Sequence, residues 1–295
     1  MKTNNKGVVY IVIATLGFSI IPILANMGLE NNLSSATLLF YRFFIAGVVF
    51  LAYCVITKRK ICLKDKKEAL YICVAGVIYS VQCISFFSSF QYISPSIGEI
   101  IYHCYPLFTL ILASLILKEG VTKKKVIGVI LSVVGTSIVL YAPWQMAEIR
   151  GIMYVIMAAL VSAIYMVYTK KRITNMDTIV LTMYLCFVCC AIYFLYSMVN
   201  GEFVFISNPK IIFYVSILAL FSTIVGFFAF MKAISLLSVG KVSILSLFEP
   251  IFTILLDYII LGTKLTILQI IGTAVILLAI YIYDRPCKDD LLAEV

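Results

Sequence analysis

Long apolar stretches recur along the whole chain, and they restrict its possible folds more than any other feature. Ten of them follow one another, at about 7–28, 35–57, 68–90, 96–117, 124–142, 150–169, 177–198, 211–232, 239–261 and 266–283. A helix needs about 20 predominantly apolar residues to cross the hydrocarbon core of a bilayer. Only 13% of the residues are charged, whereas soluble domains average about 25%. We therefore expect an all-α membrane protein with ten transmembrane helices.

The positive charges of the chain are concentrated in alternate loops. If the N-terminus is cytoplasmic, 19 of the 23 Lys and Arg residues lie on the cytoplasmic side, three lie in loops on the other side, and Arg42 lies within a span. This asymmetry follows the positive-inside rule, and it predicts a multi-pass protein of the cell membrane with both termini cytoplasmic. We therefore expect the lipid bilayer, rather than nucleic acid, to be the partner of these charges.

The two halves of the chain align with each other after a shift of 144 residues, without a gap. The best match sets the PLFT segment at 106–109 on the PIFT segment at 250–253. Each half holds five spans, an odd number, so the second half must enter the membrane from the opposite side. We therefore expect two inverted repeats, residues 1–148 and 149–295. Secondary transporters are often built in this way, with a site near the bilayer midplane between the repeats.

The fourth predicted span carries polar residues inside its apolar part. Helical spacing places Glu99, Tyr102, His103 and Pro106 on one side, with Tyr105 beside them. A charge at mid-bilayer costs about 2.5–3.5 kcal/mol, so such residues usually face the bundle interior or a wet cavity. Proline donates no N–H, so it leaves a carbonyl of the preceding turn without its helical partner. This span is predicted to be the wall of a solvated path.

The ninth predicted span repeats this pattern in the same register, with Glu249 and Pro250 near its middle. For Ser246 and Thr253 we favour hydrogen bonds that only hold helices together. Glu99 and Glu249 are too costly to keep for packing alone, so we favour a functional role for them. The predicted cavity residues are Tyr79, Gln82, Glu99, Tyr102, His103, Tyr105, Pro106, Ser246, Glu249, Pro250 and Thr253.

Three further charged residues are candidates for structural or gating roles. Arg42 either reaches the membrane interface or pairs with an acid inside the bundle, and the sequence leaves both open. Glu119 ends the fourth span and is a candidate for capping or gating, while the second repeat has Thr263 at that position. Asp257 lies near the outer end of the ninth span, where it can reach water.

His103 is the only histidine of the chain and lies four residues from Glu99. A histidine titrates between pH 5 and 8, so Glu99, His103 and Glu249 form a candidate proton relay. A hydrogen bond from His103 to a neighbouring helix is an equally good interpretation. One histidine cannot build a His-rich metal centre, so we expect no metal and no cofactor, with protons as the candidate coupling ion.

The chain resembles the EamA-domain transporters of the drug/metabolite transporter superfamily. The resemblance rests on the two five-span halves, on Arg42-Phe43, on the mid-helix Pro106 and on the segment 117–120, Leu-Lys-Glu-Gly, followed by Gly128. It implies ten helices around a central cavity that opens to one side at a time. It also implies a small organic cargo such as an amino acid, an amine or a related solute, most often exported.

The residues favour a secondary transporter that works by alternating access. Because Glu99 and Glu249 outnumber the basic groups near them, an amino-bearing, zwitterionic or cationic solute fits best, with Tyr102, Tyr105 and Tyr79 as aromatic faces for an ammonium group. A membrane-embedded enzyme is the alternative, but the chain shows no nucleophile–base spacing and no phosphate-binding glycine loop. A non-transporting scaffold or sensor is a further alternative. The identity of the solute and the choice between monomer and homodimer stay open.

Overall fold

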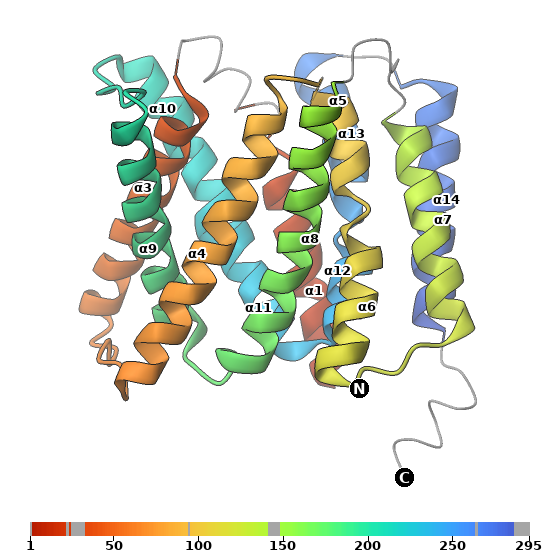
Figure 1. The fold of residues 1–295 in the computed structure, drawn as a ribbon, viewed down its shortest axis with the longest axis horizontal. Helices are drawn as coiled ribbons and strands as arrows, with labels where there is room; N and C mark the ends of the chain where they lie inside the picture. Colours follow the sequence, from red (N-terminus) through yellow and green to blue (C-terminus); the bar gives the residue numbers. More distant parts are fainter. Residues whose placement is uncertain are drawn as a thin grey trace.

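The computed structural model shows a bundle of helices that run roughly parallel and antiparallel to one another (Figure 1). It describes residues 2–21, 24, 33–93, 95–140, 148–262 and 265–285, and these contain no strand. Eight helices in this part are long and apolar enough to cross a membrane, and 5–18 is a shorter apolar helix. The predicted all-α fold is confirmed.

The helical elements keep the order of the predicted spans, although several spans are divided. They are α1 (Lys2–Phe18), α3 (Ser35–Ile56), α4 (Lys66–Ser89), α5 (Pro95–Tyr102), α6 (Tyr105–Leu117), α7 (Lys123–Val139), α8 (Ile149–Arg172), α9 (Thr178–Val199), α10 (Pro209–Leu218), η1 (Ala219–Phe227), α11 (Phe228–Leu236), α12 (Val239–Leu245), α13 (Phe248–Leu256), η2 (Asp257–Leu261) and α14 (Ile267–Asp284).

The fourth and ninth predicted spans are each broken into two helices near a proline. The first break lies between α5 and α6, and Pro106 stands in the first turn of α6, where a missing N–H costs no helical hydrogen bond. The second break lies between α12 and α13, just before Pro250. There the carbonyl of Ser246 accepts a hydrogen bond from the N–H of Glu249 at 2.9 Å instead. The prolines therefore end one helix and start another, rather than only bending a continuous one.

The eighth predicted span, 211–232, is longer and less regular than the sequence suggests. It continues as α10, η1 and α11 from Pro209 to Leu236, and η1 is a π-helix of nine residues. π-Helical turns are rare and often mark functional sites. No residue pattern in the sequence predicts this change of helix type.

The two ends of the bundle differ in charge. The end at which α3, α6, α8 and α11 finish carries Lys58–Lys60, Lys118, Lys170–Arg172 and Lys232, and we call it the cationic end (Figure 1). Between the two ends, the bundle surface carries large exposed apolar side chains such as Leu115, Leu195 and Ile259, as lipid requires.

The broken helices run in opposite directions and pack differently at the two ends of the bundle. At the cationic end α6 packs directly against α12. At the other end α5 packs mainly against α8, and α13 packs mainly against α1. The polar breaks of both helices therefore lie in the middle of the bundle, above a closed cationic end.

Candidate functional site

A cavity of about 100 Å³ lies in the middle of the bundle, beside the two helix breaks. One water needs about 10–15 Å³ on this measure, so the cavity has room for several waters or a small solute. Its lining comes from α1 and the residue Ile21 after it, α3, α4, α5, α6, α8, α11, α13 and the break before α13. The lining residues are Phe18, Ile21, Arg42, Tyr79, Gln82, Cys83, Phe86, Phe87, Glu99, Tyr102, Tyr105, Ser162, Tyr165, Met166, Phe230, Ser246 and Glu249.

Most of the lining residues occur in pairs that are 144 residues apart in the sequence. These pairs are Phe18 with Ser162, Ile21 with Tyr165, Phe86 with Phe230, Tyr102 with Ser246, and Tyr105 with Glu249. Equivalent positions of the two halves therefore face the same space. Four of the five pairs are chemically unlike and only Phe86 and Phe230 are identical, so equivalent positions contribute different groups to the cavity.

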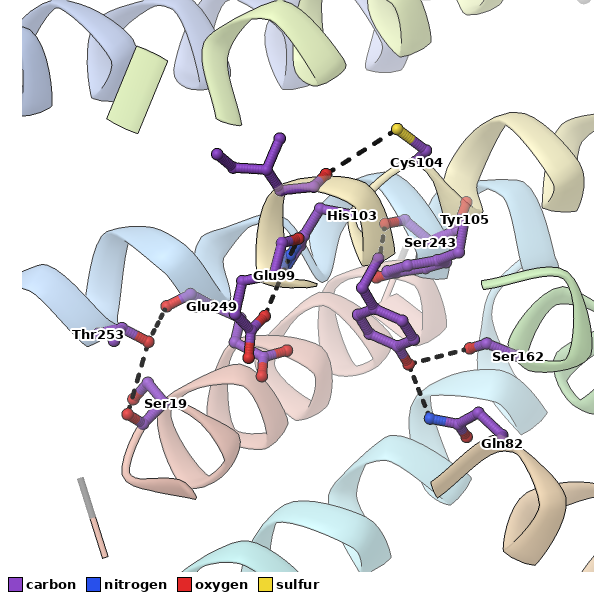
Figure 2. Close-up of polar contacts among 12 residues, drawn as sticks. Ser19, Gln82, Glu99, His103, Cys104, Tyr105, Ser162, Ser243, Glu249 and Thr253 are labelled. Atoms are coloured by element: carbon purple, nitrogen blue, oxygen red, sulfur yellow. Dashed lines mark hydrogen bonds and ion pairs between the residues drawn. The ribbon is translucent and has the colours of Figure 1, made fainter. Parts of the chain in front are cut away.

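Both mid-span glutamates contribute to this cavity. Glu99 comes from α5 and Glu249 from the first turn of α13, and Figure 2 shows them in one region between the broken helices and α1. The Glu99 side chain is 20% exposed although it lies in the middle of a span. An acid with access to a solvated cavity avoids most of the cost of full burial. Both acids line the same cavity, and their functional role stays a prediction.

A chain of hydroxyl and amide groups crosses the cavity wall. The Tyr102 hydroxyl accepts a hydrogen bond from Gln82 Nε2 at 2.9 Å and donates one to Ser162 Oγ at 3.2 Å (Figure 2). These contacts join α5 to α4 and α8. The Tyr105 hydroxyl donates to the carbonyl of Ser243 in α12 at 3.3 Å. Each broken helix is thus fixed to its neighbours close to its break.

His103 lies at the break but does not line the cavity. Its side chain is buried, its Nδ1 lies 2.8 Å from the carbonyl oxygen of Glu99, and the same Nδ1 lies 3.4 Å from Glu99 Oε2. A carbonyl only accepts, so Nδ1 carries the proton in this arrangement. Nε2 is buried without a hydrogen-bond partner among the described residues. The expected bond to a neighbouring helix is instead a bond to the preceding turn.

Arg42 lies inside the bundle, with 3% of its surface exposed. It does not reach the interface, and its partner is not an acid. Its Nε donates to Thr223 Oγ1 of η1 at 2.7 Å, and its guanidinium lies 5.2 Å from the centre of the Phe43 ring. No ion pair within 4.0 Å involves Arg42 in the described part of the chain.

Several predicted residues have local structural contacts. Ser246 Oγ donates to the carbonyl of Val242 at 2.9 Å, although the residue also lines the cavity. Thr253 Oγ1 donates to the carbonyl of Glu249 at 3.0 Å. Pro106 and Pro250 are buried at the breaks and lie outside the cavity lining. Both hydroxyl bonds lie within the residue's own chain segment, whereas the expected contact between helices is a 3.5 Å approach of Thr253 Oγ1 to the carbonyl of Ser19 (Figure 2). The structural role of Ser246 and Thr253 stays a prediction.

Glu119 joins the end of α6 to the start of α12 at the cationic end. Its two carboxylate oxygens accept hydrogen bonds from the N–H groups of Val239 at 2.8 Å and Gly240 at 3.1 Å, at the start of α12. Beside it, Lys170 Nζ donates to the carbonyls of Ile234 and Leu237 at 2.9 and 2.8 Å. These contacts tie together the ends of α6, α8 and α11 and the start of α12. The side chain of Asp257 and the residue Thr263 lie outside the described residues.

Sequence reasoning missed lining residues on α1, α8 and α11. Phe18, Ser162, Tyr165 and Phe230 are apolar or singly polar residues in ordinary spans, so composition alone does not mark them. The shift of 144 residues pairs Ser162, Tyr165 and Phe230 with Phe18, Ile21 and Phe86, which the sequence does not mark either, so the repeat alone does not find them. Thr223 could not be found either, because its role depends on η1.

The comparisons with known proteins agree with this architecture. The model of the EamA-like transporter family matches the chain twice, over residues 5–141 and 149–283. The chain belongs to the EamA-like transporter family. It is a multi-pass membrane transporter, as expected from the resemblance.

Individual relatives cover most of this EamA-like chain. An uncharacterised transporter of Archaeoglobus fulgidus is 27% identical, over 83% of this chain and 86% of the relative. The uncharacterised transporter YyaM of Bacillus subtilis is 25% identical, over 92% of both chains. A crystal structure with 16% identity superposes with a TM-score of 0.83 over 98% of both chains, which supports the fold alone.

Proposed function

We propose that this protein is a secondary transporter that moves a small amino-bearing solute across the cytoplasmic membrane by alternating access. The observation that carries the proposal is the central cavity, where Glu99 and Glu249 face one solvated space at the two helix breaks. An acid in a span is expensive and usually marks a substrate or ion path. Export is the direction that the family resemblance favours.

The proposed topology is ten spans in two inverted repeats, with both termini in the cytoplasm. It is supported by the double match of the family model, by the opposite directions of α5–α6 and α12–α13, and by cavity residues that pair 144 positions apart. The location of most Lys and Arg residues at one end supports a cytoplasmic position for that end.

The packing of the broken helices supports a specific mechanism. In this conformation α6 meets α12 at the cationic end, while α5 and α13 pack on different neighbours. A shift of 144 residues maps the pair α6 and α12 onto α13 and α5. We therefore propose that inward opening separates α6 from α12 and brings α5 against α13, so that the cavity reaches one side at a time.

Proton coupling is part of the proposal. His103 Nδ1 lies within 3.4 Å of Glu99 Oε2, and Glu99 shares the cavity with Glu249. A proton on one of these groups can therefore move when a charged solute arrives or leaves. If His103 takes part, the pH profile of transport in a His103→Gln variant differs from that of the wild type. An unchanged profile removes His103 from the relay and leaves it a structural residue.

The direct test of the function is solute uptake into proteoliposomes containing the purified protein. We expect saturable uptake of an amino-bearing solute, recovered chemically unchanged, and at least a tenfold loss of uptake in a Glu249→Gln variant. The size of the loss follows from a missing charged contact of about 1.5–3 kcal/mol. Glu148→Gln, an acid at the start of α8 without a side-chain cap bond, is the matched control. Wild-type uptake by Glu249→Gln would contradict the assignment.

A further inference from the structure

The guanidinium of Arg42 is the only cationic group in the lining of the described cavity, and its hydrogen bonds are incomplete. Thr223 accepts from Nε, whereas Nη2 is buried without a partner among the described residues. Thr223 is a neutral acceptor, so the buried positive charge has no anionic partner within 4.0 Å in the described part. Burying a charge in this way is costly unless an anion meets it during function.

The position of Arg42 is fixed from two sides. Its bond to Thr223 anchors the guanidinium to η1, and the ring of Phe43 lies against it at 5.2 Å. A guanidinium is planar and presents its N–H groups as a fork that matches a carboxylate with two parallel hydrogen bonds. Because Nε already donates to Thr223, the unpartnered Nη2 group is the one that remains for a ligand.

The opposite charge lies in the same cavity. Glu99 and Glu249 come from the two broken helices, whereas Arg42 comes from α3. The same lining also carries the aromatic rings of Phe18, Phe86, Phe87 and Phe230 beside its polar groups. A solute that satisfies all three features carries an anionic group, a cationic group and an apolar side chain.

We propose that Arg42 binds the carboxylate of a zwitterionic amino acid whose ammonium group faces Glu99 and Glu249 and whose apolar side chain contacts the phenylalanines. This inference rests on the proposed transport function and names its substrate class. It gives Arg42 a binding role, with Thr223 as the residue that positions it. An amine without the carboxylate leaves the guanidinium unpaired, and an acid without the ammonium group leaves the glutamates unpaired.

The test compares solutes that differ in one group. Uptake into proteoliposomes is measured for leucine, methionine, phenylalanine and tryptophan, and for the amine lacking the carboxylate and the acid lacking the amino group of each. We expect at least one amino acid to be taken up with an apparent affinity at least tenfold higher than that of both of its analogues. Equal uptake of the amino acid and its amine would overturn the inference while leaving the transport function standing.

Variants assign the preference to the residue. Arg42→Gln should bring the amino acid and its amine to within about threefold of each other, whereas Arg42→Lys should keep part of the preference because it keeps the charge. Arg172→Gln removes an arginine of the cationic end and should retain the wild-type preference.

If Arg42→Gln aggregates, Arg42→Lys and Thr223→Val replace it in the test. Gel filtration shows whether each variant is folded, and a reduced preference for the amino acid over its amine supports the role of Arg42. Undiminished preference in the folded Arg42 variants would contradict the role of Arg42. Absence of saturable uptake for every solute would count against both the inference and the function.

Discussion

Among the individual side chains, the Tyr102 hydroxyl has the most connected position in the cavity wall. It joins the amide of Gln82 on α4 to the hydroxyl of Ser162 on α8. A polar group at such a depth is stable only while its partners are present, because an unsatisfied donor or acceptor costs about 1–3 kcal/mol. The hydroxyl therefore orients α5, and with it Glu99, toward the cavity.

Tyr102→Phe tests this position. The change removes two hydrogen bonds and leaves Gln82 and Ser162 without that partner, so we expect a loss of about 1–3 kcal/mol in the free energy of unfolding in detergent. The ring and its packing are retained, so the protein should still fold. Tyr154→Phe is the control, because Tyr154 is exposed and stacks on Tyr92. Equal stability of the two variants would show that the Tyr102 hydroxyl holds nothing in place.

Among the helices, α12 depends on a side chain from the other half of the chain. Glu119 accepts hydrogen bonds from the first two N–H groups of α12, and it follows the left-handed Lys118 that ends α6. Both contacts are charge-assisted, which makes them stronger than neutral ones. Thr263 stands at the equivalent position of the second half, so a carboxylate clamp of this kind is encoded in one half only.

Glu119→Gln is expected to loosen the start of α12. We expect faster amide hydrogen exchange in the segment 236–245 and a loss of about 1–3 kcal/mol in stability, because two bonds to a charged acceptor are weakened. Hydrogen exchange with mass spectrometry measures the first effect. In Glu148→Gln the same segment should exchange at the wild-type rate. An unchanged rate in Glu119→Gln would show that other contacts hold the cationic end.

The helix pair α7 and α14 packs through glycines of both helices. A methyl group added at Gly272 would lie 2.7 Å from the backbone nitrogen of Val139 and 2.8 Å from the carbonyl oxygen of Gly135. Backbone atoms cannot move aside as a flexible side chain does. The two helices must therefore separate if this glycine is replaced.

Gly272→Ala should lower the free energy of unfolding by about 1–3 kcal/mol, the usual cost of overpacking. Thermal unfolding in detergent, followed by the loss of helical circular dichroism, measures the effect. Gly120→Ala is the matched control, since no atom lies within 4 Å of the position of its added methyl group. A variant at Gly272 as stable as the control would mean that α7 and α14 are not closely packed in the membrane.

The features of this fold that the sequence predicts are those that depend on a single stretch of residues, rather than on contacts between distant helices. Apolar length gives the spans, and a proline with a nearby acid marks Glu99 and Glu249 at the breaks. The partner of Arg42 could not be predicted, because it depends on the π-helical turns around Thr223. For His103 the sequence leaves Glu99 and a neighbouring helix open as partners, because a histidine at i+4 can bond to its own helix as well as to a neighbour, and the structure places its Nδ1 on the carbonyl of Glu99.

At the scale of the whole transporter, the broken helices pack differently at the two ends of the bundle. At the cationic end α6 and α12 are packed together and clamped by Glu119, whereas α5 and α13 lie against different helices. In the proposed inverted-repeat topology, the two halves can exchange these arrangements, because α6 and α12 correspond to α13 and α5 after a shift of 144 residues. A conformational change of this kind needs no new fold, only a change of neighbours.

Side-specific labelling of Ser246→Cys, in a background with the nine native cysteines replaced, tests this mechanism most directly. Ser246 lies at the second break and lines the cavity. A membrane-impermeant thiol reagent is applied to right-side-out and inside-out vesicles, with and without a solute that the protein takes up in the proteoliposome assay. Alternating access predicts that the cysteine is modified from both sides and that the bound solute slows both reactions. Modification from one side only, or rates that the solute leaves unchanged, would contradict it.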